Sequence, residues 1–213
     1  KVVEYKIGYP VKENVVATVY GNGDLEFSGS GNTMNFANGD TPWANEDYTY
    51  VIFKDEITPT NIDYWFTGNS NLTGCDTLPK SIESARGAFK DCASLIKTPS
   101  YFQCSALKII TECFSGCVNL ESSDPLPVNV MEADYAFQNC EKMSNAPDMT
   151  KTNALSSING ILKGCTSLVE APVIPDSVLD MTEAFAGDSN IYTASVFPEN
   201  VENISSAYLE CIS

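Results

Sequence analysis

The sequence predicts an α/β repeat solenoid, a right-handed superhelix of stacked coils with parallel strands, preceded by a small β-rich N-terminal cap. Three observations support this fold class. An aromatic-centred motif recurs through most of the 213 residues, its copies share one register of apolar positions, and residues 1–58 carry β-type patterns instead. We therefore divide the chain into an N-terminal cap at 1–58 and a repeat region at 59–213.

The repeated motif reads small residue, Phe, two variable residues, Cys, two variable residues, Leu. We number each copy from its central aromatic or Leu residue, which is position 0. Successive centres are 23 or 25 residues apart, and they are Phe66, Phe89, Phe114, Phe137, Leu162, Phe185 and Tyr208. Position −4 is also apolar in every copy: Ile62, Ala85, Ile110, Ala133, Ile158, Met181 and Ile204. Agreement at so many positions excludes a chance pattern.

A period of 23 to 25 residues lies within the ~20–29 residue range of leucine-rich repeats. One coil of this length cannot bury its apolar side alone, so stacked coils form a continuous core. We place a strand at 168–172 and its equivalents, which would pair in parallel at ~4.8 Å. The spacing of Val178, Met181, Ala184 and Phe185 suits a short helical turn on the opposite side, although an extended segment fits the same residues.

The N-terminal segment predicts strands and a hairpin. Residues 15–20 and 25–28 are β-type runs, and Asn22-Gly23 between them is a strong hairpin signal. Residues 48–53 read as another strand. Because the first coil of a solenoid exposes its core, a cap is the expected role. The alternative is an independent ligand-binding β-domain.

Five of the eight cysteines occupy position +3 of the repeat, and Asn69 and Asp188 take that place in two other copies. The five are Cys92, Cys117, Cys140, Cys165 and Cys211. Interchange among Cys, Asn and Asp predicts a small inward side chain that bonds to nearby backbone. We expect free buried thiols here, although neighbouring cysteines could come within disulfide range. Cys113 and Cys117 form the one close pair in the sequence, which is too little for a Cys₄ zinc site.

The composition limits which catalytic groups and which classes of partner the chain can have. The chain has no histidine, which removes the commonest general base and zinc ligand. A net charge of −16 argues against nucleic acid and anionic lipid as partners, and no apolar run approaches the ~18 residues of a membrane span. The Asn-Gly-Asp runs at 22–24 and 38–40 could hold calcium, but ordinary turns explain them. We expect no cofactor and no catalytic residue, while a carboxylate pair of the glycosidase kind remains the enzymatic alternative.

Copies such as Ala88-Phe89-x-x-Cys92-x-x-Leu95 resemble the BspA-like leucine-rich repeats of bacterial surface proteins. The resemblance covers residues 62–213, and the segment from Ala17 to Trp43 also looks like the β-segment that precedes such repeats. The resemblance implies secretion or surface display and a role in adhesion or host-ligand binding, and it supplies no catalytic residues. Lys1 is not an initiator Met, and we expect an export signal to have preceded it. Similar modules occur in prophage tail proteins, which is the alternative reading.

These considerations predict a non-enzymatic, extracellular binding or adhesion module that recognises a protein or glycan. Repeat solenoids bind through the sheet face and its adjoining loops. The candidate ligand-binding residues are Lys97, Tyr101, Phe102, Glu121, Asn145, Glu170 and Tyr192. Tyr101 and Phe102 form an aromatic pair in a long-copy insertion and could be contact residues, or they could fold back over the core edge.

Overall fold

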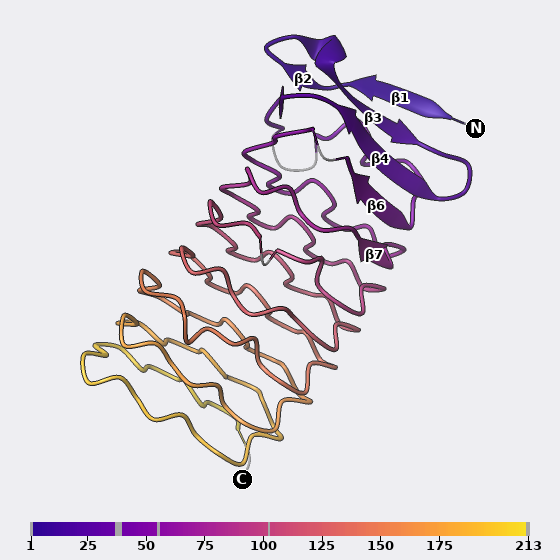
Figure 1. Cartoon of the computed structure of the whole chain (residues 1–213). Helices are drawn as coiled ribbons and strands as arrows, with labels where there is room; N and C mark the ends of the chain where they lie inside the picture. The colour runs from indigo at the N-terminus through magenta and orange to yellow at the C-terminus, as the bar shows by residue number, and fades with distance from the viewer. Residues whose placement is uncertain (1, 37–39, 55, 102, 212–213) are drawn as a thin grey trace.

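The structure, a computed structural model, describes residues 2–36, 40–54, 56–101 and 103–211. Its N-terminal part is a five-stranded sheet of order β1-β3-β4-β6-β7 (Figure 1). The strands are β1 (Val3–Lys6), β3 (Val15–Val19), β4 (Asp24–Gly29), β6 (Tyr50–Phe53) and β7 (Gly74–Cys75). A second pair joins β2 (Gly8–Tyr9) to β5 (Asn32–Thr33), and a short 3₁₀ helix, η1, spans Lys12–Asn14.

The expected hairpin at residues 15–28 is confirmed. Strands β3 and β4 pair antiparallel with Val19 opposite Leu25, and the Tyr20 N–H donates to the Asp24 carbonyl at 2.8 Å. Gly23 supplies the positive φ, 93°, that the turn requires. Further along the sheet the pairing becomes parallel, and β7 already belongs to the first repeat. The N-terminal sheet therefore continues directly into the repeats.

Each repeat forms one turn of chain, called a coil here, and the coils lie one below another from the sheet to the C-terminus (Figure 1). Parallel bridges join position −5 of each coil to position −5 of the next, as between Ser84 and Ile109 and between Ile109 and Glu132. This shared register places every coil over its predecessor with the same face outward.

The expected fold class, an α/β repeat solenoid wound as a right-handed superhelix, is wrong, because the described residues form short strands and irregular chain. The described residues contain no α-helix, and η1 is their single helical element. The segment expected as a helical turn instead directs alternate backbone N–H groups to the next coil. Ala85, Gly87, Phe89 and Asp91 donate to carbonyls 24 residues ahead, at 2.7–2.9 Å. The residues between them make local turn bonds, such as Ala88 N–H to Ala85 O at 3.2 Å. The backbone groups that an α-helix would use internally thus connect neighbouring coils.

Left-handed residues make this alternation possible. Positions −2 and +2 have positive φ in each coil, for example Tyr135 at 57° and Asn139 at 59°. Such residues interrupt a right-handed helix, and away from glycine they cost ~1–2 kcal/mol each. Glycine takes the same positions in other coils, as at Gly160 and Gly164. The sequence pattern of apolar spacing carried no sign of these dihedral angles.

The parallel strands expected at 168–172 and its equivalents are also wrong as continuous strands. In the first repeat the equivalent segment forms the two-residue strand β7, which pairs in parallel with β6. In the later described coils it forms isolated bridges, Lys97 to Ser122 and Glu170 to Thr193. Proline explains the interruption, because it has no N–H to donate to a neighbouring coil. It follows a bridged residue in three coils, as Pro99, Pro125 and Pro172, and Pro147 takes the equivalent place in a coil with no described bridge there.

The core runs down the centre of the coils. Phe89, Phe114 and Phe137 stack in succession, with ring centroids 5.5 and 5.4 Å apart and planes within 18°. Leu162 continues the column, and all four side chains are buried. The shared register of position 0 thus places the Phe137 ring on the Phe114 ring. At the N-terminal end the column meets an aromatic cluster, where Trp43 and Trp65 lie 5.2 Å apart.

Candidate functional site

The candidate binding residues follow the buried Leu, Met or Ile of each coil, at positions +7 and +8. Lys97, Glu121, Asn145, Glu170 and Tyr192 are all exposed there. They lie on successive coils. Parallel bridges join Lys97 to Ser122 and Glu170 to Thr193, and the bridges at position −5 keep the coil of Asn145 in the same stack. The structure thus spreads them along one extended face, which is called the bridge face below.

Contacts at the upper part of the bridge face are loose and solvated. The Lys97 Nζ lies 3.8 Å from the Asp124 carboxylate, and Lys97 is largely exposed. Such surface ion pairs contribute little to stability. The Asn145 amide donates to the neighbouring Ser144 Oγ at 3.1 Å. Glu121 has a backbone role, since its N–H donates to the Ile96 carbonyl at 2.8 Å. These side chains are therefore free to meet a partner.

Glu170 and Tyr192 form a pair across adjacent coils. The Tyr192 hydroxyl donates to the Glu170 carboxylate at 2.9 Å, and both side chains are exposed. This hydrogen bond and the nearby negative charge raise the pKa of the Tyr192 phenol. The pair presents an aromatic ring edged by a carboxylate.

Tyr101 does not reach solvent. It is buried, its ring lies 6.3 Å from Phe114, and its hydroxyl donates to the Asp124 carbonyl at 2.8 Å. The expectation that it is an exposed contact residue is wrong, and the alternative, in which it folds back over the core edge, is confirmed. The physical reason is that a ring next to the apolar column gains burial while its hydroxyl still finds a backbone partner. Phe102 lies outside the described residues.

The last two full coils carry exposed apolar side chains that the sequence reasoning did not single out. Positions +7, +9 and +11 are Val169, Ala171 and Val173 in one coil, and Tyr192, Ala194 and Val196 in the next. The bridge from Glu170 to Thr193 sets these two rows in register. Earlier coils have polar residues in at least one of these positions, such as Glu121 or Asp148. Aligning position +11 as well as +7 would have found the rows.

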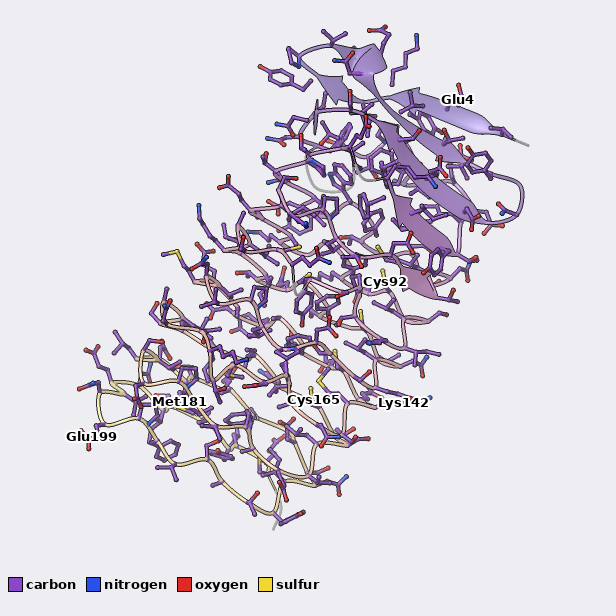
Figure 2. The ribbon with its side chains drawn as sticks, viewed as in Figure 1. Glu4, Cys92, Lys142, Cys165, Met181 and Glu199 are labelled. Atoms are coloured by element: carbon purple, nitrogen blue, oxygen red, sulfur yellow. The ribbon has the colours of Figure 1, made fainter. Side chains whose placement is uncertain are left out.

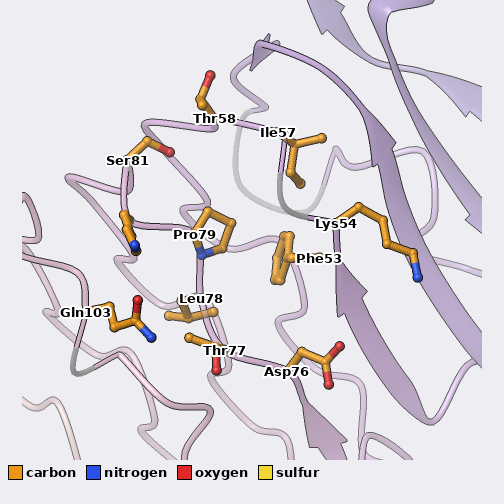
Figure 3. A pocket seen from close by; sticks show the side chains of 11 residues that line it. Phe53, Lys54, Ile57, Thr58, Asp76, Thr77, Leu78, Pro79, Ser81 and Gln103 are labelled. Carbon is orange, nitrogen blue, oxygen red and sulfur yellow. The ribbon is translucent and has the colours of Figure 1, made fainter.

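A groove lies where the N-terminal sheet meets the first coils, with a volume of about 840 Å³ (Figure 3). Phe53 lies opposite Leu78 and Pro79 in it, whereas Lys54 extends away, toward Glu26 at 3.2 Å. The Asp76 carboxylate on its rim accepts a hydrogen bond from the Tyr50 hydroxyl at 3.0 Å. Among the described lining residues, no nucleophile lies beside a base that could activate it.

The cysteine column lies inside the coils, as Figure 2 shows for Cys92 and Cys165. Each thiol donates to the carbonyl of position 0 in the preceding coil. Examples are Cys117 Sγ to Phe89 O at 3.1 Å and Cys165 Sγ to Phe137 O at 3.2 Å. The predicted burial and backbone bonding are confirmed, with Cys211 only partly buried. Burial raises the pKa of these thiols, to about 12 for Cys117. They remain protonated at neutral pH, and a neutral thiol is a poor nucleophile.

Asp188 occupies the same position in the next coil and is fully buried. Among the described residues, neither of its carboxyl oxygens has a hydrogen-bond partner. The N–H groups of Cys165 and Gly164 lie near it and stabilise the charged form, but they already donate to Leu162 O and Ala186 O. Burial dominates and raises the pKa of Asp188 to about 8. A protonated Asp188 could donate a hydrogen bond as the thiols of the column do.

Within the described ranges, no group of His, Cys, Asp or Glu side chains is arranged to hold a metal ion. None of the helices described there has the length and apolar character needed to cross a membrane. The calcium alternative at residues 38–40 falls partly outside the described residues. At 22–24 the Asn22 amide donates to the Asp24 carboxylate at 2.7 Å within the β3–β4 turn.

Comparison with known proteins gives two structural neighbours. No protein-family model matches the sequence, and no curated protein matches it. The chain is similar to a leucine-rich repeat protein from Eubacterium ventriosum, with TM-score 0.37 and 13% identity over 92% of this chain and 78% of that one. It is also similar to a leucine-rich repeat protein from Bacteroides ovatus, with TM-score 0.33 and 13% identity over 94% and 89%. Both structural neighbours are bacterial leucine-rich repeat proteins.

Proposed function

We propose that this chain is a non-enzymatic binding module that works outside the cell and recognises a macromolecular partner, a protein or a glycan. The observation that carries the proposal is the bridge face. It displays exposed side chains from successive coils in one register, and in the last two coils these are apolar and aromatic. Exposed apolar side chains gathered on one face of a soluble protein are a common mark of an interaction surface.

The chemistry of the titratable groups supports the non-enzymatic reading. Enzymes tune acids, bases and nucleophiles at solvent-accessible sites. Here the thiols with raised pKa values are buried within the coils, and Asp188 is sealed among them. The acidic residues of the bridge face, Glu121 and Glu170, lie in open solvent on separate coils. Their environment offers neither the burial nor the close carboxylate pairing that glycosidase chemistry requires.

A binding screen tests this proposal. The purified chain is immobilised and exposed to panels of glycans, extracellular matrix proteins and whole bacterial or host cells. We expect saturable binding to at least one of them, weakened when exposed residues of the bridge face, such as Lys97, Asn145 or Tyr192, are replaced by Ser. In parallel, polysaccharides are incubated with the protein and their reducing ends are measured. Reproducible turnover that is lost on Glu121→Gln or Glu170→Gln would refute the non-enzymatic reading.

A further inference from the structure

The last part of the repeat region combines an apolar surface with an excess of negative charge. Val173, Tyr192 and Val196 are 71%, 65% and 89% exposed. Beyond Lys163 the sequence contains no Lys or Arg. The same segment contains eight acidic residues. Asp188 is buried and protonated at neutral pH, and the seven that reach solvent are Glu170, Asp176, Asp180, Glu183, Glu199, Glu202 and Glu210. Apolar and anionic character therefore coincide on the same coils.

The apolar part is a continuous surface because the two rows are in register. The Ala171 N–H donates to the Thr193 carbonyl at 3.2 Å, and the Tyr192 N–H donates to the Val169 carbonyl at 3.2 Å. These bonds align Val169 with Tyr192. A hydrogen bond from the Ser195 hydroxyl to the Pro172 carbonyl at 2.6 Å continues this register toward Val173 and Val196. We call this surface, made of Val169, Val173, Tyr192 and Val196, the apolar ladder.

The anionic part borders the ladder. Glu170 accepts the hydrogen bond of Tyr192 and lies beside the ladder itself. Asp176 and Glu199 follow the two rows along the chain and are exposed, and Figure 2 shows Glu199 at the edge of the molecule. Among the described ion pairs, the one in this region joins Glu183 to Lys163 at 2.7 Å. Most of the negative charge around the ladder is therefore uncompensated.

We propose that the apolar ladder binds a cationic protein segment that carries apolar side chains, so that its apolar residues cover the ladder and its Lys or Arg residues meet the surrounding carboxylates. This inference rests on the proposed binding function and names its partner class. Charge selects this occupant, because opposite potentials steer association and like potentials oppose it. A second copy of the chain would bring the same anionic coils, and anionic lipid would be repelled for the same reason.

The test uses three short synthetic peptides as probes, in which Val alternates with Lys, Ser with Lys, and Val with Glu. Binding to the whole chain is measured by fluorescence anisotropy, and the site is mapped by amide chemical shifts. We expect the Val/Lys peptide to bind most tightly and to shift the amides of residues 169–173 and 192–197. The paired variant Val173→Ser/Val196→Ser should weaken its binding about tenfold, because it removes apolar area from the contact.

Ile96→Ser is the matched control, since Ile96 is an exposed apolar residue at position +7 of an earlier coil. Ile96→Ser should leave the affinity unchanged. Like the paired variant, it replaces exposed side chains, so both proteins should stay folded. Glu170→Gln and added salt should each weaken binding of the Val/Lys peptide.

Equal binding of the Ser/Lys or Val/Glu peptide, no binding of the Val/Lys peptide, or an unchanged affinity of the paired variant would each overturn the inference. Adsorption to vesicles containing phosphatidylserine, at the ladder, would do the same. A partner from the binding screen that maps to another part of the bridge face overturns this inference and leaves the proposed function intact. If the binding screen finds no macromolecular partner, the inference and the proposed function are both refuted.

Discussion

Replacing Asp188 by Asn should stabilise the protein, and increasingly so as pH rises. Asp188 is fully buried among the thiols of the cysteine column, and its carboxyl oxygens have no hydrogen-bond partner in the described part of the chain. The titratable groups that face it are the thiols of Cys165, from the preceding coil, and Cys211, from the following one. Neither thiol is charged at neutral pH, so no cation compensates an ionised Asp188. An Asn side chain removes the charge and keeps the shape.

The size of the effect follows from the shift in pKa. The unfolded chain releases the proton near the ordinary value of 3.8, whereas burial in the folded chain raises the pKa of Asp188 to about 8. Below pH 3.8 the carboxyl is neutral in both the folded and the unfolded state, so Asp188 does not lower the unfolding free energy. As pH rises, stability falls by ~1.4 kcal/mol per pH unit, until the folded state also loses the proton near pH 8. At pH 7 the accumulated loss is about 4 kcal/mol.

The assay is urea denaturation of the original chain and Asp188→Asn at pH values from 4.5 to 9. The difference in unfolding free energy should be small at the acid end, should grow with pH, and should level off above pH 8. Asp188→Cys, which restores the usual residue of the column, should behave like Asp188→Asn. Asp176→Asn is the matched control, because Asp176 is exposed and its replacement changes the net charge equally.

A stability difference that stays constant from pH 4.5 to 9 would refute the reasoning. So would a destabilised Asp188→Asn protein at pH 8, because it would mean that the carboxylate is ionised and bound in the folded state. The amide has a precedent in the column: Asn69 occupies position +3 of the first coil and donates to the Tyr48 carbonyl at 3.0 Å.

Three further predictions follow from the packing of the coils. Phe137→Ala should cost ~3–5 kcal/mol of unfolding free energy, as truncation of buried aromatics does, and a loss under ~1 kcal/mol in a denaturant titration would mean that the stacked register is wrong. Gly160→Ala should destabilise the chain because its new Cβ would clash with the Tyr135 ring and because Gly160 has a positive φ, 56°; Tyr135→Ala should relieve part of that loss, which a double-mutant cycle measures. Thiol titration in denaturant without reductant should find at least five reactive thiols, whereas native protein should react slowly; one thiol or none after denaturation would restore a disulfide framework.

The repeat register was readable from the sequence because burial imposes the same residue types at the same place in every coil. Position 0 and position −4 must fill the core, so Phe137 and Ala133 could be assigned without a structure. The hairpin at β3–β4 was readable too, since Asn22-Gly23 is selected by local turn geometry. The cysteine column followed from the interchange of Cys, Asn and Asp at one inward position.

The tertiary structure alone decided how the backbone satisfies its hydrogen bonds. Apolar spacing in 178–185 fits a helical turn, yet the N–H groups of these coils bond to the next coil, because alternating left-handed residues such as Glu183 turn them outward. Hydrophobic patterns report which side chains are buried and do not report the partner of each peptide group. The same limit applies to the bridge face: Tyr101 is buried by a neighbouring coil, and the apolar ladder exists only because stacking brings Val173 beside Val196.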